Sequence, residues 1–219
     1  VLRLPRLSEL CGPFVVFPVG TQANAALEND RLEGFELGVD VTPAPGVGLS
    51  LTAFDNRVKN AGANVTLDTN LRQRRNIDAV HARGIEASIS ATLGEVSFDA
   101  SAAWTDAEAQ GSGFAAALDG NRPSQTPRFV AGATLAWRPA ENWLLSTTLR
   151  HVGAQFEDDL ETDLLPAATT LDAFVQVPLT DTIALVLRGE NLTDETIVTR
   201  NQGGSIDFGV PRTVWAGVE

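Results

Sequence analysis

The residues from Phe129 to Leu149 alternate between apolar and polar side chains on both sides of a short break. Every second residue is apolar from Phe129 to Trp137, and the alternation resumes at Trp143 after a break that begins at Pro139. A period of two is that of a β-strand with one apolar face, and the proline-containing break is typical of a turn. This stretch therefore predicts a β-hairpin with a tryptophan on each side of its turn, as a membrane-spanning hairpin requires at the lipid–water boundary.

The same period recurs along most of the chain. Further alternating segments lie at 34–42, 47–54, 85–93, 96–104, 171–177, 183–188 and 211–219. Short turns are predicted near 44, 94, 140 and 181, and long loops near 59–74, 107–127, 157–168 and 193–209. The first 33 residues predict an irregular loop with one short strand at Phe14–Phe17.

This layout is typical of an antiparallel up-and-down β-barrel in a membrane. About nine strands of roughly ten residues alternate between short turns at one end and long loops at the other. Tilted strands of that length cross the hydrocarbon layer. The alternative is a soluble all-β protein, whose strands also alternate because one face packs against a core.

The alternation predicts the direction of individual side chains. We expect lipid-facing positions at Phe129, Ala131, Ala133, Leu135, Val96, Phe98, Ala100, Leu185 and Leu187. We expect lumen-facing positions at Ser97, Asp99, Thr134, Ser146 and Arg188.

Composition excludes several classes of function. A net charge of -12 argues against a nucleic-acid partner. No apolar run reaches the roughly 18 residues of a transmembrane helix. The single cysteine, Cys11, has no internal disulfide partner. His81 and His151 are far apart in the sequence and lack metal-ligand spacing, and no Gly-x-Ser-x-Gly elbow is present. We therefore expect no cofactor and no enzymatic activity.

Two charged clusters are candidates for ligand chemistry. Arg72, Arg74 and Arg75 lie at the end of a predicted loop, where planar guanidinium groups suit an anionic ligand. The alternative is that they pair with carboxylates of the lumen or with lipopolysaccharide phosphates, and we favour it because structural ion networks are the commoner cause of such clusters. The acidic run from Asp158 to Asp163 offers oxygen ligands for calcium, but it lacks the glycine of an EF-hand loop, and a solvated acidic loop is the favoured interpretation.

Four segments resemble the C-terminal part of TonB-dependent outer-membrane receptors. Residues 4–10 resemble the family's Pro-Thr-Leu-x-Glu-Leu segment, and residues 24–38 resemble Asn-Pro-x-Leu-x-Pro-Glu followed by Glu-x-Gly, here without the prolines. Gly84, Ile85 and Glu86 resemble the family's Gly-Ile-Glu, while residues 191–195 and 209–213 resemble Asn-Leu-x-Asp and Gly-x-Pro-Arg. The chain has no tyrosine, so the residues expected at the membrane interface are Trp104, Trp137, Trp143 and Trp215.

The resemblance implies a function and its partners. Residues 1–219 are expected to form the C-terminal portion of the family's 22-stranded barrel, without its N-terminal plug domain. The implied activity is uptake of a scarce, bulky ligand such as a ferric siderophore or cobalamin, energised by the TonB–ExbB–ExbD complex through the missing N-terminal part. The other implied partners are outer-membrane lipid and lipopolysaccharide.

The resemblance also implies a location. We expect a Gram-negative outer membrane, with the short turns in the periplasm and the long loops outside. Val1 is interpreted as an internal start, and the chain is expected to be incomplete, with a curved open sheet whose first and last strands do not pair. The alternatives are a soluble β-rich binding domain and an outer-membrane β-barrel enzyme.

Overall fold

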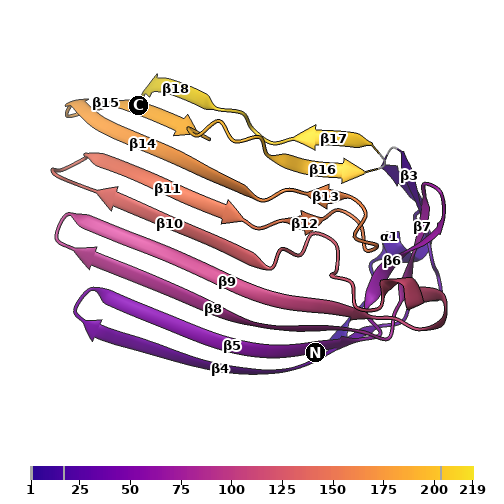
Figure 1. Ribbon diagram of the computed structural model, residues 1–219. Coiled ribbons are helices and arrows are strands. Elements are labelled where there is room, and N and C mark those ends of the chain that lie inside the picture. The colour runs from indigo at the N-terminus through magenta and orange to yellow at the C-terminus, as the bar shows by residue number, and fades with distance from the viewer. Residues whose placement is uncertain (1, 17, 203) are drawn as a thin grey trace.

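A computed structural model describes residues 2–16, 18–202 and 204–219, so Val1, Phe17 and Gly203, which belong to the predicted start, short strand and last loop, lie outside the described residues. Within these residues, ten strands form one antiparallel sheet (Figure 1). Its order is β1 (Leu2–Arg3), β4 (Asp30–Ala44), β5 (Val47–Lys59), β8 (Ala79–Leu93), β9 (Val96–Gln110), β10 (Phe129–Trp137), β11 (Leu144–Val152), β14 (Ala168–Thr180), β15 (Ile183–Glu190) and β18 (Thr213–Val218). Strand neighbours in the sheet therefore follow chain order, as predicted for an up-and-down topology.

The remaining elements gather at one end of the sheet (Figure 1). A four-stranded sheet has the order β2 (Phe14–Val16), β3 (Val19–Gln22), β7 (Leu71–Asn76) and β6 (Gly62–Asp68). Helix α1 (Leu7–Cys11), the 3₁₀ helix η1 (Gly113–Leu118) and two small strand pairs, β12 (Gln155–Phe156) with β13 (Leu164–Leu165) and β16 (Val198–Gln202) with β17 (Ser205–Phe208), complete the loops. None of the described helices is long and apolar enough to cross a membrane.

The short turns lie at the other end, where the sequence predicts them. They connect β4 to β5, β8 to β9, β10 to β11 and β14 to β15. Gly46 has a φ of 79°, and a Cβ there would lie 2.5 Å from the carbonyl oxygen of Thr92, so the first turn requires glycine. A Cβ on Gly84 would lie 2.2 Å from the carbonyl oxygen of Trp104 and 2.6 Å from the ring of Phe54. That close approach explains the glycine of the Gly-Ile-Glu segment.

The register of the strands places the predicted apolar positions on one face. Val96 pairs with Trp137, which pairs with Leu145, and the same alignment continues through β14 to Leu187. The opposite face carries hydroxyl and charged groups, and Thr134 and Thr148 share a hydrogen bond of 3.0 Å across two of its strands. All residues expected to face lipid therefore share one face, and all those expected in the lumen share the other.

Several strands are longer than predicted. β4, β8 and β9 each have 15 residues, and β9 continues to Gln110 although the sequence predicts a loop from 107. Backbone pairing continues past the apolar segment, where polar residues oppose one another, with Arg57 opposite His81 and His81 opposite Glu108. Residues 59–74 are likewise not one loop, since most of them form the β6–β7 hairpin.

The sheet is open within the described residues. β4 and β18 lie at opposite sides of the sheet, and neither pairs with the other. The predicted curved sheet with unpaired first and last strands is therefore confirmed in its pairing.

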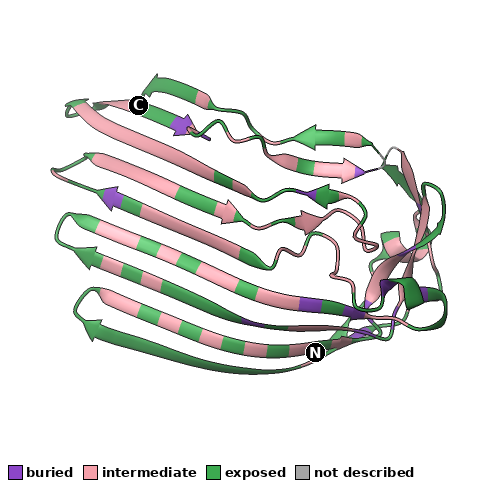
Figure 2. Ribbon diagram, viewed as in Figure 1, coloured by how far each residue is buried: buried purple, intermediate pink, exposed green. Residues whose placement is uncertain are grey.

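Buried side chains are concentrated at the loop end rather than along the sheet (Figure 2). One buried apolar cluster there consists of Ala61, Val65, Ile77, Ala109, Ala115 and Leu118. Along β4, by contrast, Phe35 is 69% exposed and Leu37 is 67% exposed. The loops thus have a core of their own, whereas the long strands present apolar side chains outward.

Asp159 ties three loops together beside this core. Its carboxylate accepts hydrogen bonds from the backbone N–H groups of Asn64 at 2.9 Å and Ser124 at 3.0 Å. Its backbone carbonyl accepts a hydrogen bond from the side chain of Asn121 at 3.1 Å. Since these partners come from β6 and from the loop before β10, one residue connects segments that are distant in the sequence.

Replacing Asp159 by Ala in the full-length protein should loosen all three loops. Each partly buried N–H group left without an acceptor costs about 1–3 kcal/mol. Hydrogen exchange at the amides of Asn64 and Ser124 should become faster by about tenfold or more. The control Asp181→Ala changes a carboxylate in an exposed short turn and should leave both amides unaffected. Unchanged exchange in Asp159→Ala would show that the loops hold together without this residue.

Candidate functional site

The three arginines of the predicted cluster lie on β7 but point to two different faces. Successive residues of a strand alternate in direction, so Arg72 and Arg74 share one face and Arg75 lies on the other. Arg72 and Arg74 line a pocket, whereas the guanidinium group of Arg75 lies 5.0 Å from the centre of the Phe114 ring. The structure therefore brings two of the three residues to one site.

The pocket lies between α1, the β2–β3 hairpin and the β6–β7 hairpin. Its volume is about 130 Å³. Besides the two arginines, it is lined by Ser8, Glu9, Gly12, Phe14, Thr21, Gln22 and Asn64. The parallel pairing of β3 with β7 builds it, because this pairing sets Thr21 opposite Arg72.

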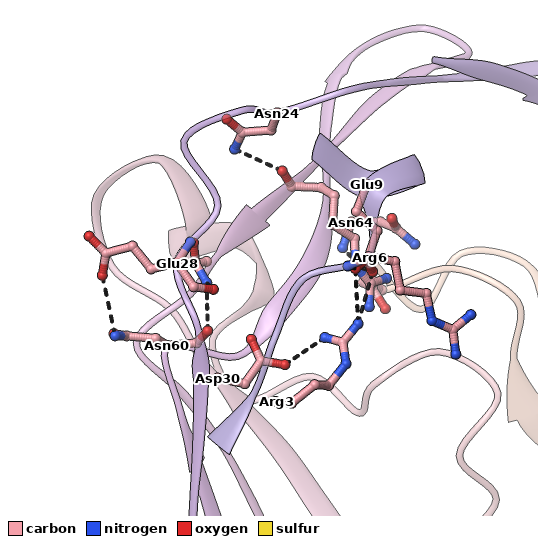
Figure 3. Close-up of polar contacts among 11 residues, drawn as sticks. Arg3, Arg6, Glu9, Asn24, Glu28, Asp30, Asn60 and Asn64 are labelled. Atoms are coloured by element: carbon pink, nitrogen blue, oxygen red, sulfur yellow. Dashed lines mark hydrogen bonds and ion pairs between the residues drawn. The ribbon is translucent and has the colours of Figure 1, made fainter. Parts of the chain in front are cut away.

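Glu9 joins two arginines at one side of the pocket, and Figure 3 shows its contact with Arg3. Its carboxylate lies 2.9 Å from Nη2 of Arg3 and 3.3 Å from Nε of Arg74. Arg3 also donates to Asp30 at 2.7 Å, which anchors the network to the start of β4. The charge of Arg74 is therefore compensated, although its buried Nε makes no hydrogen bond.

The electrostatic environment stabilises the ionised form of Glu9. Burial alone would raise the pKa of Glu9, but a hydrogen bond from the backbone N–H of Arg6 and the charges of Arg3 and Arg74 outweigh burial, so its pKa is lowered. The Arg6 hydrogen bond, at 2.7 Å, also caps the first turn of α1.

Arg72 differs from Arg74 because no carboxylate pairs with it. Its Nε donates to the hydroxyl of Thr21 at 3.1 Å, and none of the ion pairs found among the described residues includes Arg72. Burial raises the pKa of Glu157, although a hydrogen bond from Gln125 and the nearby charge of Arg72 both act to lower it. A guanidinium group that faces a pocket without a carboxylate partner can hold an anionic oxygen of a ligand.

The tryptophans expected at the membrane interface occupy different places. Trp104 and Trp137 share the apolar face at opposite ends of the β9–β10 pair. Trp143 precedes β11 in the turn. Trp215 lies on the polar face opposite Arg188, whose guanidinium group is 5.5 Å from the ring centre. Trp104 and Trp137 therefore lie where rings could flank an apolar band on the same side of the sheet, whereas Trp215 does not.

The two histidines and the acidic loop lie apart, and each forms contacts only with its own neighbours among the hydrogen bonds described here. His81 contacts Asp55 at 2.8 Å, and His151 contacts the hydroxyl of Thr169 at 2.8 Å. The carboxylate of Asp158 accepts backbone N–H groups of its own loop, including those of residues 162 and 163. Within the part of the chain that the structure describes, no cluster of three or more His, Cys, Asp or Glu side chains could hold a metal ion.

Sequence reasoning missed the contributions of Arg3, Glu9 and Asp30 to the site. All three fall in the first 33 residues, which predict an irregular loop. The one local signal is the spacing of Arg6 and Glu9, since a glutamate three residues after a helix start can cap it. The contact of Glu9 with Arg74 on β7 joins residues far apart in the sequence and leaves no periodic pattern.

Comparison with known proteins gives a family and a fold. The family described as "TonB dependent receptor-like, beta-barrel" matches residues 2–192. None of the curated protein sequences compared with the chain matches it.

Several solved structures have a similar fold. They include the ferric yersiniabactin uptake receptor FyuA from Yersinia pestis, with a TM-score of 0.72 and 19% identity over 87% of this chain and 29% of that chain. The copper transporter OprC has a TM-score of 0.75 and 15% identity over 99% of this chain and 35% of that chain. The ferric citrate transporter FecA, in its unliganded form, has a TM-score of 0.70 and 19% identity over 86% of this chain and 31% of that chain. The chain thus spans about a third of the length of these proteins.

The lowered pKa of Glu9 predicts that acid loosens α1. Because the pKa in the folded state lies below that in the unfolded state, the ionised carboxylate stabilises the fold above the ordinary pKa of about 4.3. This contribution is lost as the pH falls through the lowered pKa. Hydrogen exchange over residues 6–12, corrected for its intrinsic pH dependence, should therefore rise as the pH falls below about 4.3 in the full-length protein.

The variant Glu9→Gln should remove this pH dependence and exchange quickly at every pH. Glu141→Gln, a change of the same kind in the turn before β11, should behave as the unmodified protein. An acid transition that persists in Glu9→Gln would assign the effect to another group.

Proposed function

Since the chain belongs to the family of TonB-dependent receptor β-barrels, we propose that it forms part of the barrel wall and outer loops of a receptor that takes up a scarce, bulky ligand, with a ferric siderophore as the first candidate and cobalamin as the second. Two of the structural relatives described above carry the names of ferric chelates, and one is a copper transporter. These names support an iron chelate as the ligand class.

The position of Arg72 is the main structural support for an anionic ligand. It presents a charged, planar group to a pocket at the loop end, and among the described residues no carboxylate forms an ion pair with it. Ferric chelates offer carboxylate, phenolate or catecholate oxygens, which suit the guanidinium fork. The pocket of about 130 Å³ is much smaller than the roughly 300–1,000 Å³ of ordinary ligand sites. It therefore suits one anionic arm of a ligand rather than a whole chelate.

The apolar face of the long sheet supports placement in an outer membrane. The apolar alternation of β9 runs from Val96 to Trp104, and nine residues match the roughly 9–11 of a tilted membrane-spanning strand. Soluble proteins rarely expose a continuous apolar surface of this extent, which disfavours the soluble binding domain. We propose that this face contacts lipid and the polar face borders the lumen.

The orientation and the remaining partners complete the proposal. The short turns lie in the periplasm and the loop end lies outside the cell. Residues 1–219 are the C-terminal part of the barrel domain, and energy comes from the TonB–ExbB–ExbD complex through another part of the receptor. We propose no catalytic activity for the chain.

Arg72→Gln in the full-length receptor should weaken ligand binding. Loss of a charged hydrogen bond costs about 1.5–3 kcal/mol, which corresponds to roughly a 10- to 100-fold rise in Kd. Binding of radiolabelled ferric citrate, ferric yersiniabactin and cobalamin would be measured on whole cells. Arg138→Gln, at the turn end, should bind as the unmodified receptor. A receptor that binds none of the three probes would contradict the proposed ligand classes, and equal binding by Arg72→Gln would remove this residue from the site.

Arginine placed on the two faces of β10 should have different effects on assembly. Ala133→Arg puts a charge on the apolar face at mid-strand and should cost about 2–4 kcal/mol when that face meets lipid. Thr134→Arg puts the same charge on the polar face and should cost much less. The measurement is the amount of folded full-length receptor in the outer membrane and its unfolding free energy in urea. Equal assembly of the two variants would show that the lipid-facing side is wrongly assigned.

A further inference from the structure

The pocket at the loop end combines two arginines with one carboxylate. Arg72 and Arg74 line it together with Glu9, and the other lining residues are uncharged. Glu9 also contacts Arg3, but Arg3 forms a second ion pair with Asp30, so the charges of Arg3 and Asp30 cancel. The lining of the pocket therefore carries a single net positive charge.

The donors that remain for a ligand belong to Arg72 and Thr21. The Nε of Arg72 donates to the hydroxyl oxygen of Thr21 at 3.1 Å. Among the described residues, the two terminal nitrogens of Arg72 have no acceptor, and neither has the hydroxyl hydrogen of Thr21. Thr21 is only 7% exposed, so its hydroxyl group has little access to bulk water. A guanidinium edge beside a hydroxyl donor matches the two oxygens of a carboxylate.

Glu9 brings a fixed negative charge to the same pocket. Its carboxylate lies 3.3 Å from Nε of Arg74, and its contacts with Arg3 and with the backbone N–H of Arg6 hold it in place. A ligand carboxylate adds one negative charge, which the net charge of the pocket neutralises. A phosphate group adds about two, so one negative charge would stay unpaired in a partly buried site, where unpaired charge is costly.

We propose that Glu9 determines the specificity of this pocket and restricts it to a ligand arm with one negative charge, a carboxylate that is not bound to the metal. The carboxylate accepts hydrogen bonds from the terminal nitrogens of Arg72 and from the hydroxyl of Thr21. The inference rests on the proposed function, because it concerns the anionic arm that enters this pocket. It favours ferric chelates that keep a free carboxylate and disfavours phosphorylated ligands.

A carboxylate outside the pocket provides a matched control. Glu33 also contacts two basic residues, Arg31 at 3.1 Å and Lys59 at 2.7 Å, but it lies on β4 and does not line the pocket. Glu33→Gln changes the charge of the whole receptor by the same amount as Glu9→Gln. Only an effect within the pocket therefore distinguishes the two variants.

The experiment measures the binding of two small anions to the full-length receptor. Acetate and methylphosphonate share a methyl group, whose saturation-transfer NMR signal reports weak binding, and in mildly alkaline buffer they carry one and two negative charges. The part of the signal that is lost in Arg72→Gln defines binding in this pocket. The unmodified receptor should bind acetate more tightly than methylphosphonate by about tenfold or more, because the second charge has no partner.

Two variants raise the charge of the pocket by one unit in different ways. Glu9→Gln removes the fixed carboxylate, whereas Gln22→Lys adds a positive charge on β3 and leaves the cap of α1 intact. In both, methylphosphonate binding should improve relative to acetate binding by about tenfold or more. A gain shared by Gln22→Lys does not come from a loosened α1. Glu33→Gln should leave the ratio of the two affinities within about twofold of that of the unmodified receptor.

Four results would overturn the inference. They are the absence of an Arg72-dependent acetate signal, equal binding of the two anions by the unmodified receptor, an unchanged ratio in either pocket variant, and an equal change of the ratio in Glu33→Gln. Binding of ferric citrate, ferric yersiniabactin and cobalamin to the same receptor is measured in parallel. Binding of one of these without a preference for acetate overturns this inference alone, while a preference for acetate without binding of any of the three contradicts the proposed ligand classes alone.

Discussion

Hydrogen bonding between neighbouring strands is the constraint on which the rest of this structure depends. Pairing in strict chain order fixes the register across the long strands, and the register fixes which side chains share a face. In a membrane the backbone has no water to bond with, so every strand needs a neighbour, and each unpaired group costs several kcal/mol. In the described sheet, β18 has no partner on one side, and the outer side of β4 is paired only at Asp30 and Arg31, with the two-residue strand β1. Further strands at these edges would satisfy them, in agreement with the greater length of the structural relatives.

The two ends of the long sheet have different physical characters. At the turn end the strands are joined by short connections that need special backbone geometry, as at Gly46. At the loop end the chain builds a separate apolar core, a four-stranded sheet and a network of ion pairs. Long strands such as β9 run from the turn end to the loop end and become more polar toward the loop end. The proposed ligand contact at Arg72 therefore lies in the loop end of the molecule and not on the long strands.

Much of this architecture was accessible from the sequence because a period of two is a local signal. The alternation from Phe129 to Trp137 predicts both the strand and its apolar face, and the turns at Gly46 and Gly94 follow from local backbone chemistry. The same period also places Arg75 on the opposite face from Arg72 and Arg74, so the three arginines do not form a single cluster. Residue type alone predicts Trp215 at the membrane interface, but its register with Arg188 places it on the polar face.

Other features could not be predicted because they depend on contacts between distant segments. Nothing near Glu9 indicates that Arg74 lies beside it, and nothing near Asp159 indicates Asn64 as its partner. The continuation of β9 past Trp104 depends on pairing with β8 and not on its own apolar pattern.

The parallel pairing of β3 with β7 has a consequence for the order in which the protein folds. Gly20 and Leu71 are partners, and the whole β4–β5 hairpin lies between them in the sequence. Closing a loop of about 50 unstructured residues is entropically costly, but a hairpin that has already formed brings its two ends together and removes most of that cost. We therefore expect the hairpin to form before the small sheet, so that the pocket around Arg72 assembles only after this part of the long sheet is in place.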